Sequence, residues 1–101
     1  MNVEFVLAAE FELDEAVAYY TGKGEALAAR FRSAVADGVA RIAERPHAWQ
    51  PVGGGARRYR LRRFPYGLVY RVKDDTATIY AVMHLKRRPQ YWRSRMPQIE
   101  K

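Results

Sequence analysis

Basic and apolar side chains alternate at strand spacing in the second half of this 101-residue chain, and this pattern favours a fold built on a β-sheet. From position 57 to position 73 the chain contains no carboxylate. Successive side chains of a strand point to opposite faces, so the alternation supplies one face for a core and one cationic face. We expect three strands here, at about 56–64, 67–73 and 76–85, joined by tight turns.

The first half of the chain has the periodicity of α-helices. Residues 2–7 alternate and predict a short opening strand, but from about residue 9 the apolar positions recur every three or four residues. One helix is expected from there to the turn at Thr21–Gly24. A longer helix is expected from about 25 to 44, where Pro46 ends it. Two consecutive helices joined by a tight turn form a helical hairpin.

The predicted order is therefore β-α-α-β-β-β, an α+β fold in which an antiparallel-type sheet is backed by the helical hairpin. We expect residues 1–101 to form one domain, since this length suits a single small core. Residues 47–55 are expected to be a loop. Its Gly53–Gly55 run is interpreted as a flexible connector, because a phosphate-binding loop would end in Lys-Ser/Thr and lead into a helix. A short turn or helix at about 89–95 is expected to lie over the edge of the sheet.

The net charge of +7 is distributed unevenly. Residues 1–50 contain 5 Lys/Arg and 8 Asp/Glu, a charge of −3, whereas residues 51–101 contain 13 Lys/Arg and 3 Asp/Glu, a charge of +10. Charged residues that served only to keep the surface soluble would be distributed more evenly between the two halves. We therefore interpret the basic half as a binding surface for an anionic partner, either nucleic acid or an acidic protein.

Composition argues against several classes of protein. The chain has no cysteine, so it has no disulfide framework, thiolate metal site or cysteine nucleophile. Its two histidines are far apart in the sequence, and neither a metal nor a cofactor is expected. The N-terminus lacks the basic region of a secretory signal, and no apolar run approaches the roughly 20 residues of a membrane span. These features predict a cytoplasmic protein without a membrane partner.

Arginines of the first long strand are the leading candidates for binding. Arg58, Arg60 and Arg62 alternate with apolar residues, so they are expected to share one face, about 6–7 Å apart. This spacing is close to that of phosphates along a nucleic-acid backbone. The alternative is an edge strand that uses charge to prevent aggregation, but five arginines within seven residues exceed that need. The same target-binding surface is expected to include four further basic residues, Arg71, Lys86, Arg87 and Arg88.

His84 and Tyr91 are candidates for acid–base chemistry. A neutral imidazole beside the cations of Lys86–Arg88 could accept a proton from a ribose 2′-hydroxyl. The alternative for His84 is a half-buried structural histidine. The Tyr91 phenol could act as an acid or base, stack on a nucleobase or close the core, whereas Trp92 is expected to pack in the core.

Four segments of the chain, in this order and spacing, carry a family resemblance: Glu12–Tyr20, Phe31–Pro46, Arg63–Val72 and Ala81–Trp92. Together they extend over nearly the whole chain and resemble the RelE/ParE superfamily of toxins from bacterial type II toxin–antitoxin systems. The resemblance implies the same fold as the one predicted above. It also implies a hetero-oligomer with a co-encoded antitoxin, a segment of which wraps the toxin and covers its active surface.

RelE-like members of this superfamily are ribosome-dependent ribonucleases that cut mRNA in the ribosomal A site. The resemblance places Arg58, Arg60 and Arg87 at basic positions of their active site, and Tyr91 near that of a C-terminal tyrosine. With His84 added, the catalytic candidates are Arg58, Arg60, His84, Arg87 and Tyr91. The third-strand position of an arginine is occupied by Gly67, which cannot stabilise the pentacovalent phosphate of the cleavage reaction.

ParE-like members share the scaffold, lack the ribonuclease residues and are described as poisoning DNA gyrase. The Phe64–Tyr66 turn and the His84–Trp92 segment are similar to those of ParE-like chains. The resemblance therefore favours a ParE-like, non-catalytic toxin that is neutralised by an antitoxin. A RelE-like mRNA endoribonuclease is the alternative, and a degenerate, non-toxic binding module is a second one.

Overall fold

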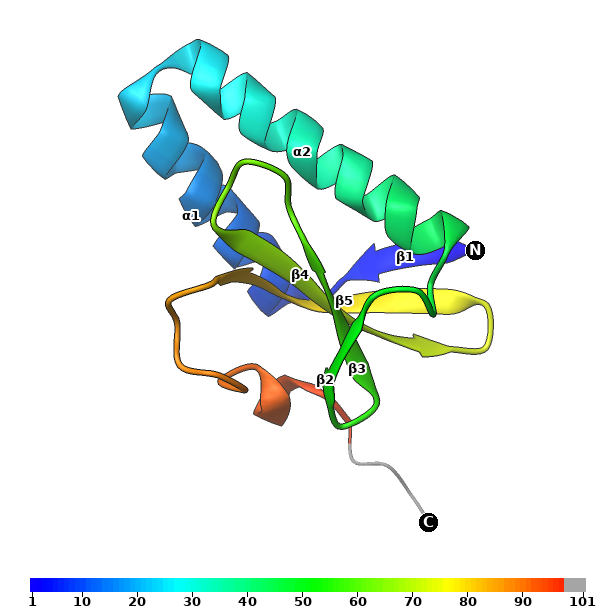
Figure 1. Ribbon diagram of the computed structural model, residues 1–101. Coiled ribbons are helices and arrows are strands. Elements are labelled where there is room, and N and C mark those ends of the chain that lie inside the picture. Colours follow the sequence, from blue (N-terminus) through cyan, green and yellow to red (C-terminus); the bar gives the residue numbers. More distant parts are fainter. Residues whose placement is uncertain (98–101) are drawn as a thin grey trace.

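The computed structural model describes residues 1–97 of the chain and shows two helices packed on a five-stranded sheet (Figure 1). The elements follow in the order β1 (Asn2–Phe5), α1 (Leu7–Lys23), α2 (Glu25–Glu44), β2 (Gln50–Gly53), β3 (Ala56–Arg60), β4 (Tyr66–Lys73), β5 (Thr76–His84) and the short 3-10 helix η1 (Arg93–Arg95). Neither α1 nor α2 contains a stretch long and apolar enough to span a bilayer.

The strands are arranged in the order β1-β5-β4-β3-β2. Strands β2 to β5 form an antiparallel meander, whereas β1 pairs in parallel with β5. The helical hairpin carries the chain from β1 at one edge of the sheet to β2 at the other and covers the face between them. The predicted α+β fold with its helical hairpin is confirmed, and the sheet gains one strand that the sequence pattern did not indicate.

That additional strand, β2, lies where a loop was expected. It pairs with β3 at the edge of the sheet, where Pro51 costs no central ladder hydrogen bond. The prediction that Gly53–Gly55 is a flexible connector was wrong. Gly53, Gly54 and Gly55 have φ angles of 96°, 63° and 78°. Gly53 ends β2, and Gly54 and Gly55 form the turn to β3. Glycine adopts such angles without steric cost, so the run serves a hairpin.

The opening strand is shorter than predicted because the chain changes from strand to helix at Val6. The Val6 N–H donates to the Ile79 carbonyl, which ends the pairing with β5. The Val6 carbonyl then accepts hydrogen bonds from Ala9 and Glu10, the first of the helix. Leu7 therefore belongs to α1, and its side chain is 67% exposed.

The main core lies between the helices and the sheet. Phe31 and Ile42 of α2 are fully buried against Leu68 and Ile79 of the central strands. The helix approaches the sheet closely at Gly38, where an added Cβ would lie 3.0 Å from the Leu68 Cδ1 atom. Aliphatic side chains buried in this way contribute about 1.5–3 kcal/mol each, so this layer supplies most of the stability.

A second, smaller core lies on the opposite face of the sheet. Trp92 is 2% exposed and packs with Val69, Ala81 and Met83. The segment that follows β5 crosses this face, on the far side of the sheet from the helices (Figure 1). Trp92 thus packs in a core, as predicted, and it buries a face that the sequence pattern suggested would be open.

Candidate functional site

The face of the sheet opposite the helices, here called the outer face, carries the predicted arginines. Ala56, Val69, Ala81 and Met83 identify it, because they pack together beneath Trp92. Arg58 and Arg60 follow Ala56 at strand spacing and lie on the same face, as predicted.

Arg62 does not share this face, and that prediction was wrong. Strand β3 ends at Arg60, and the Leu61 N–H donates to the Tyr66 carbonyl as the chain turns. Arg63 in this turn has a φ of 68°. Arg62 is therefore an exposed residue of the β3–β4 loop, and the expected row of three cations contains two.

The C-terminal segment 85–97 covers much of the outer face. Besides the burial of Trp92, Arg71 binds this segment, since its guanidinium donates to the Pro97 carbonyl (3.1 Å) and the Gly54 carbonyl (3.3 Å). The Gln90 side chain donates to the Val52 carbonyl of β2. Arg71 was predicted to bind a target, whereas its observed contacts hold the C-terminal segment on the sheet.

Glu12 of α1 fastens the same segment to the edge of β5. Its carboxylate accepts two hydrogen bonds from the Arg95 guanidinium, at 2.8 and 3.1 Å, and one from the Tyr91 hydroxyl at 2.6 Å. It also accepts the Val82 N–H at 3.0 Å. The Glu12 side chain is only 10% exposed, so these contacts are partly withdrawn from water.

The edge of β5 explains why this cluster forms. Strand β1 pairs with β5 only as far as Ile79, and the pairing of β4 with β5 then skips Tyr80. The Tyr80 carbonyl and the Val82 N–H consequently have no strand partner at this edge. Arg95 donates to the former at 2.9 Å and Glu12 accepts from the latter, which satisfies both groups. Sequence reasoning missed Glu12 because its neighbours Glu10, Asp14 and Glu15 are also acidic, and no local signal distinguishes it from them.

Tyr91 and Arg87, two of the catalytic candidates, belong to this cluster. Burial raises the pKa of the Tyr91 hydroxyl well above its usual value, and the hydrogen bond to Glu12 raises it further. The Arg87 guanidinium stacks 3.9 Å above the centre of the Tyr91 ring and lies 3.7 Å from the Glu12 carboxylate. Tyr91 therefore stays protonated at neutral pH and acts as a hydrogen-bond donor to Glu12.

His84 lies in a neighbouring cleft of about 270 Å³ between α1 and the end of β5. Its Nδ1 atom accepts the Lys86 N–H at 3.1 Å, and its ring packs edge-on against Tyr66 at 5.0 Å. Glu12 and Glu15 line the cleft together with Arg87. Since Glu12 is paired with Arg87 and Arg95, the Glu15 carboxylate is the charge of the lining that opposes the approach of a phosphate.

The nine predicted site residues are thus divided among several places. His84, Arg87 and Tyr91 gather near Glu12, whereas Arg58 and Arg60 lie across the sheet on β3. Lys86 and Arg88 are exposed in the turn after β5. Within residues 1–97, the histidine, aspartate and glutamate side chains do not form a group of three that could hold a metal ion.

Comparisons with known proteins identify the family. The model of the family described as the ParE toxin of the type II toxin–antitoxin system, parDE, matches residues 3–89. This chain belongs to the ParE toxin family. The predicted membership of the RelE/ParE superfamily is confirmed, and the chain is the toxin of a type II system in which an antitoxin is the partner.

A solved structure supports the fold of this ParE-family chain. The chain is similar to one described as the chromosomal ParDE TA system from P. aeruginosa, with a TM-score of 0.72 and 20% sequence identity. The similarity covers 83% of this chain and 95% of the other. None of the curated proteins compared with the chain matches it. The family match ends at residue 89, so Tyr91, Trp92 and Arg95 follow it in the chain.

Proposed function

We propose that this ParE-family toxin arrests growth in the cytoplasm by binding and inhibiting DNA gyrase, and that it does not cleave RNA. The target rests on the resemblance to ParE-like chains, which are described as poisoning gyrase. The absence of cleavage rests on the use that the fold makes of the candidate catalytic groups.

The observation that carries the proposal is the contact set of Glu12. Tyr91 and Arg87 would have to meet a scissile phosphate, but Tyr91 donates to Glu12 and Arg87 stacks on the Tyr91 ring. Because these groups are engaged with the Glu12 carboxylate, they are not available to stabilise the negative charge that builds up when a 2′-hydroxyl attacks phosphorus. Gly67 adds no cation on β4. The groups are arranged to hold the C-terminal segment on the sheet.

Purified toxin and purified gyrase test the proposal directly. We expect supercoiling to stop at saturating toxin, and inhibition to survive His84→Ala, because a binding toxin needs no general base. Programmed ribosomes in a translation extract should keep their mRNA intact at the same toxin concentration. Unimpaired supercoiling would refute gyrase as the target, and mRNA cleavage that Arg87→Ala slows would establish a RelE-like ribonuclease.

Expression in cells tests whether the chain is toxic. Induction without the antitoxin should arrest growth and induce the DNA-damage response before protein synthesis declines. Co-expression of the antitoxin should restore growth. Normal growth after induction of the folded toxin alone would identify a degenerate binding module.

A further inference from the structure

The Arg58 side chain passes over Gly67, which lies diagonally from it on β4, one step along the same face from its paired residue Val69. A Cβ atom added to Gly67 would stand 2.9 Å from both the Cγ and the Cδ atoms of Arg58, closer than carbon atoms approach without displacement. The next nearest atom, the Tyr59 carbonyl oxygen, would be at an ordinary 3.5 Å. The φ angle of Gly67 is not in the left-handed region. Gly67 is therefore required by the Arg58 side chain and not by its own backbone.

In this position Arg58 forms one wall of a pocket of about 260 Å³ on the outer face. Val69 and Met83 of the sheet and Trp92 of the C-terminal segment line its apolar part, and Gln50 and Gln90 contribute amide groups. Among the described residues that line the pocket, Arg58 is the only charged one. The pocket thus combines one fixed guanidinium with an apolar floor.

The guanidinium of Arg58 has unused hydrogen-bonding capacity. Within residues 1–97, its Nη2 atom donates to the Gln50 Oε1 atom at 3.2 Å, and its buried Nε atom has no acceptor. A neutral amide oxygen is a weaker partner for a guanidinium than a carboxylate, which can accept two parallel hydrogen bonds. A cation held partly out of water with these contacts favours an incoming anion.

We propose that Arg58, seated on Gly67, is the residue with which this toxin binds a carboxylate side chain of its antitoxin. The inference rests on the proposed function only in taking the partner to be the antitoxin of this ParE-family toxin, and it is independent of gyrase. Gly67 acts as a positioning residue. Because Gly67 has no side chain, the Arg58 side chain from β3 can extend over this position of β4.

The shape of the outer face favours a protein carboxylate over a nucleic-acid phosphate. A nucleic-acid strand would follow a row of cations, but Arg62 has left the strand and Arg71 is bonded to the Pro97 carbonyl. Arg58 and Arg60 remain on the strand, and of these two only Arg58 lines the small, partly apolar pocket. An Asp or Glu side chain brings a methylene stem and a planar carboxylate of this size.

Calorimetric titration of the purified toxin with the co-encoded antitoxin tests the proposal. We expect Arg58→Ala to weaken binding by about tenfold or more, as the loss of a charged hydrogen-bonded pair does, and Arg58→Lys to retain part of the affinity. Arg60→Ala is the matched control, since Arg60 lies on the same strand and face but outside the pocket. Equal losses for Arg58→Ala and Arg60→Ala would overturn the proposal in favour of general electrostatic attraction.

The Gly67→Ala variant tests the positioning role. It should weaken antitoxin binding about as much as Arg58→Ala does, and it should have no further effect in the Arg58→Ala background, where the two clashing atoms are gone. Thermal unfolding should show the same coupling, with a smaller loss of stability from Gly67→Ala in that background. Unchanged antitoxin binding by Gly67→Ala would contradict the positioning role of Gly67. Equal destabilisation by Gly67→Ala in the wild-type and Arg58→Ala backgrounds would contradict it as well.

Replacement of single antitoxin carboxylates by amides identifies the partner group. One Asp→Asn or Glu→Gln change should weaken binding to the wild-type toxin and leave binding to Arg58→Ala unchanged. If Arg58→Ala reduces the binding of a single-stranded oligonucleotide but not of the antitoxin, the pocket serves nucleic acid and the proposal is wrong. A toxin that spares gyrase while keeping the coupling of Arg58 and Gly67 would refute the proposed target alone.

Discussion

Glu12→Ala should release the C-terminal segment from the sheet. The substitution removes the acceptor of the Arg95 guanidinium, the Tyr91 hydroxyl and the Val82 N–H in a site where the carboxylate is 10% exposed. Breaking a buried ion pair on one side costs about 3–5 kcal/mol, and the 23% exposure of the Arg95 side chain places the expected cost near the lower bound, at about 3 kcal/mol. The protein has about 5–15 kcal/mol of total stability by the norm for small domains.

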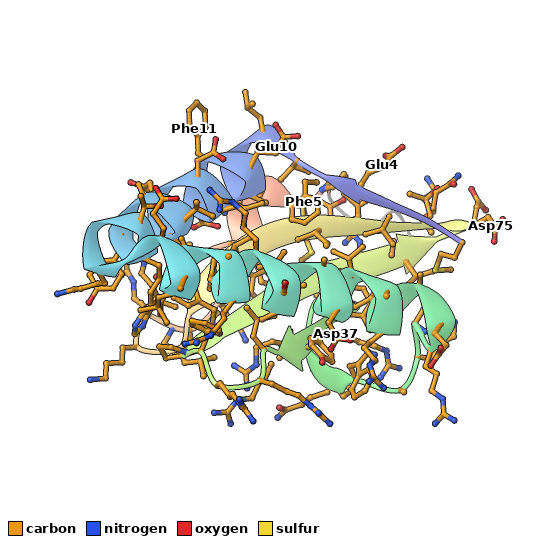
Figure 2. All side chains as sticks on the ribbon, turned by 90° about the horizontal axis from the view of Figure 1, so that it is seen from above. Glu4, Phe5, Glu10, Phe11, Asp37 and Asp75 are labelled. Carbon is orange, nitrogen blue, oxygen red and sulfur yellow. The ribbon has the colours of Figure 1, made fainter. Side chains whose placement is uncertain are left out.

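Thermal unfolding followed by circular dichroism measures this loss. At about 4–8 °C per kcal/mol for a chain of this size, the midpoint should fall by about 12–24 °C. The midpoint of Glu12→Gln should lie between those of the wild type and Glu12→Ala, because the amide oxygen still accepts one hydrogen bond but carries no charge. Glu10→Ala is the control, since Glu10 projects into solvent from the same helix (Figure 2) and should change the midpoint little.

Limited trypsin digestion gives a second readout. The segment after β5 contains the trypsin sites Lys86 and Arg87, so its release should accelerate cleavage there while the helices remain protected. Equal midpoints and equal cleavage rates for Glu12→Ala and Glu10→Ala would refute the reasoning. In that case the apolar contacts of Trp92 alone would hold the segment.

Four substitutions and a pH titration test the packing. Trp92→Ala should cost about 3–5 kcal/mol in chemical denaturation, because it empties the second core. Burial raises the pKa of Tyr70, whose hydroxyl donates to the Pro46 carbonyl, to about 12 from 10.0. Its contribution is therefore complete below pH 10 and lost as the pH rises to about 12, so the free energy of unfolding should fall by about 2–3 kcal/mol over this interval, and less in Tyr70→Phe. Gly38→Ala should destabilise by about 1–3 kcal/mol where α2 meets the sheet, whereas Gly22→Ala, with open space around it, should stabilise α1 by about 0.5–1 kcal/mol in the same assay.

Local patterns in the sequence predicted most elements of this fold. The second helix was expected at 25–44 and is observed at Glu25–Glu44, since its apolar period and Pro46 are both local signals. The third predicted strand, at 76–85, is observed at Thr76–His84. The end of β3 was misplaced because the alternation continues through Leu61, which is buried, while the backbone already turns. Side-chain patterns report burial, and burial does not require a strand.

The candidate site could be predicted only in part. Alternation was enough to place Arg58 and Arg60 on one face, because that relation is local. The partners of Glu12 lie 79 and 83 residues away along the chain, at Tyr91 and Arg95, and no period or spacing connects residues so far apart. For the same reason the sequence did not indicate that the C-terminal segment covers the outer face. A tryptophan in a terminal segment does not indicate which surface it will bury.

The uneven charge of the chain acquires a structural meaning from the ion pairs. Among residues 51–97, only Arg87 and Arg95 pair with a carboxylate, and both pair with Glu12 from the acidic half. The fold therefore separates cations that hold the C-terminal segment from cations that face solvent or the pocket on β3. Exposed cations without carboxylate partners attract an acidic chain over a distance set by salt, whereas a fixed guanidinium such as Arg58 selects a group at contact.

The association rate of the antitoxin should consequently fall with added salt, because salt screens the exposed cations. The dissociation rate should depend on Arg58 at every salt concentration. Stopped-flow kinetics at two salt concentrations resolve the two contributions, and an Arg58→Ala effect confined to the association rate would contradict this division.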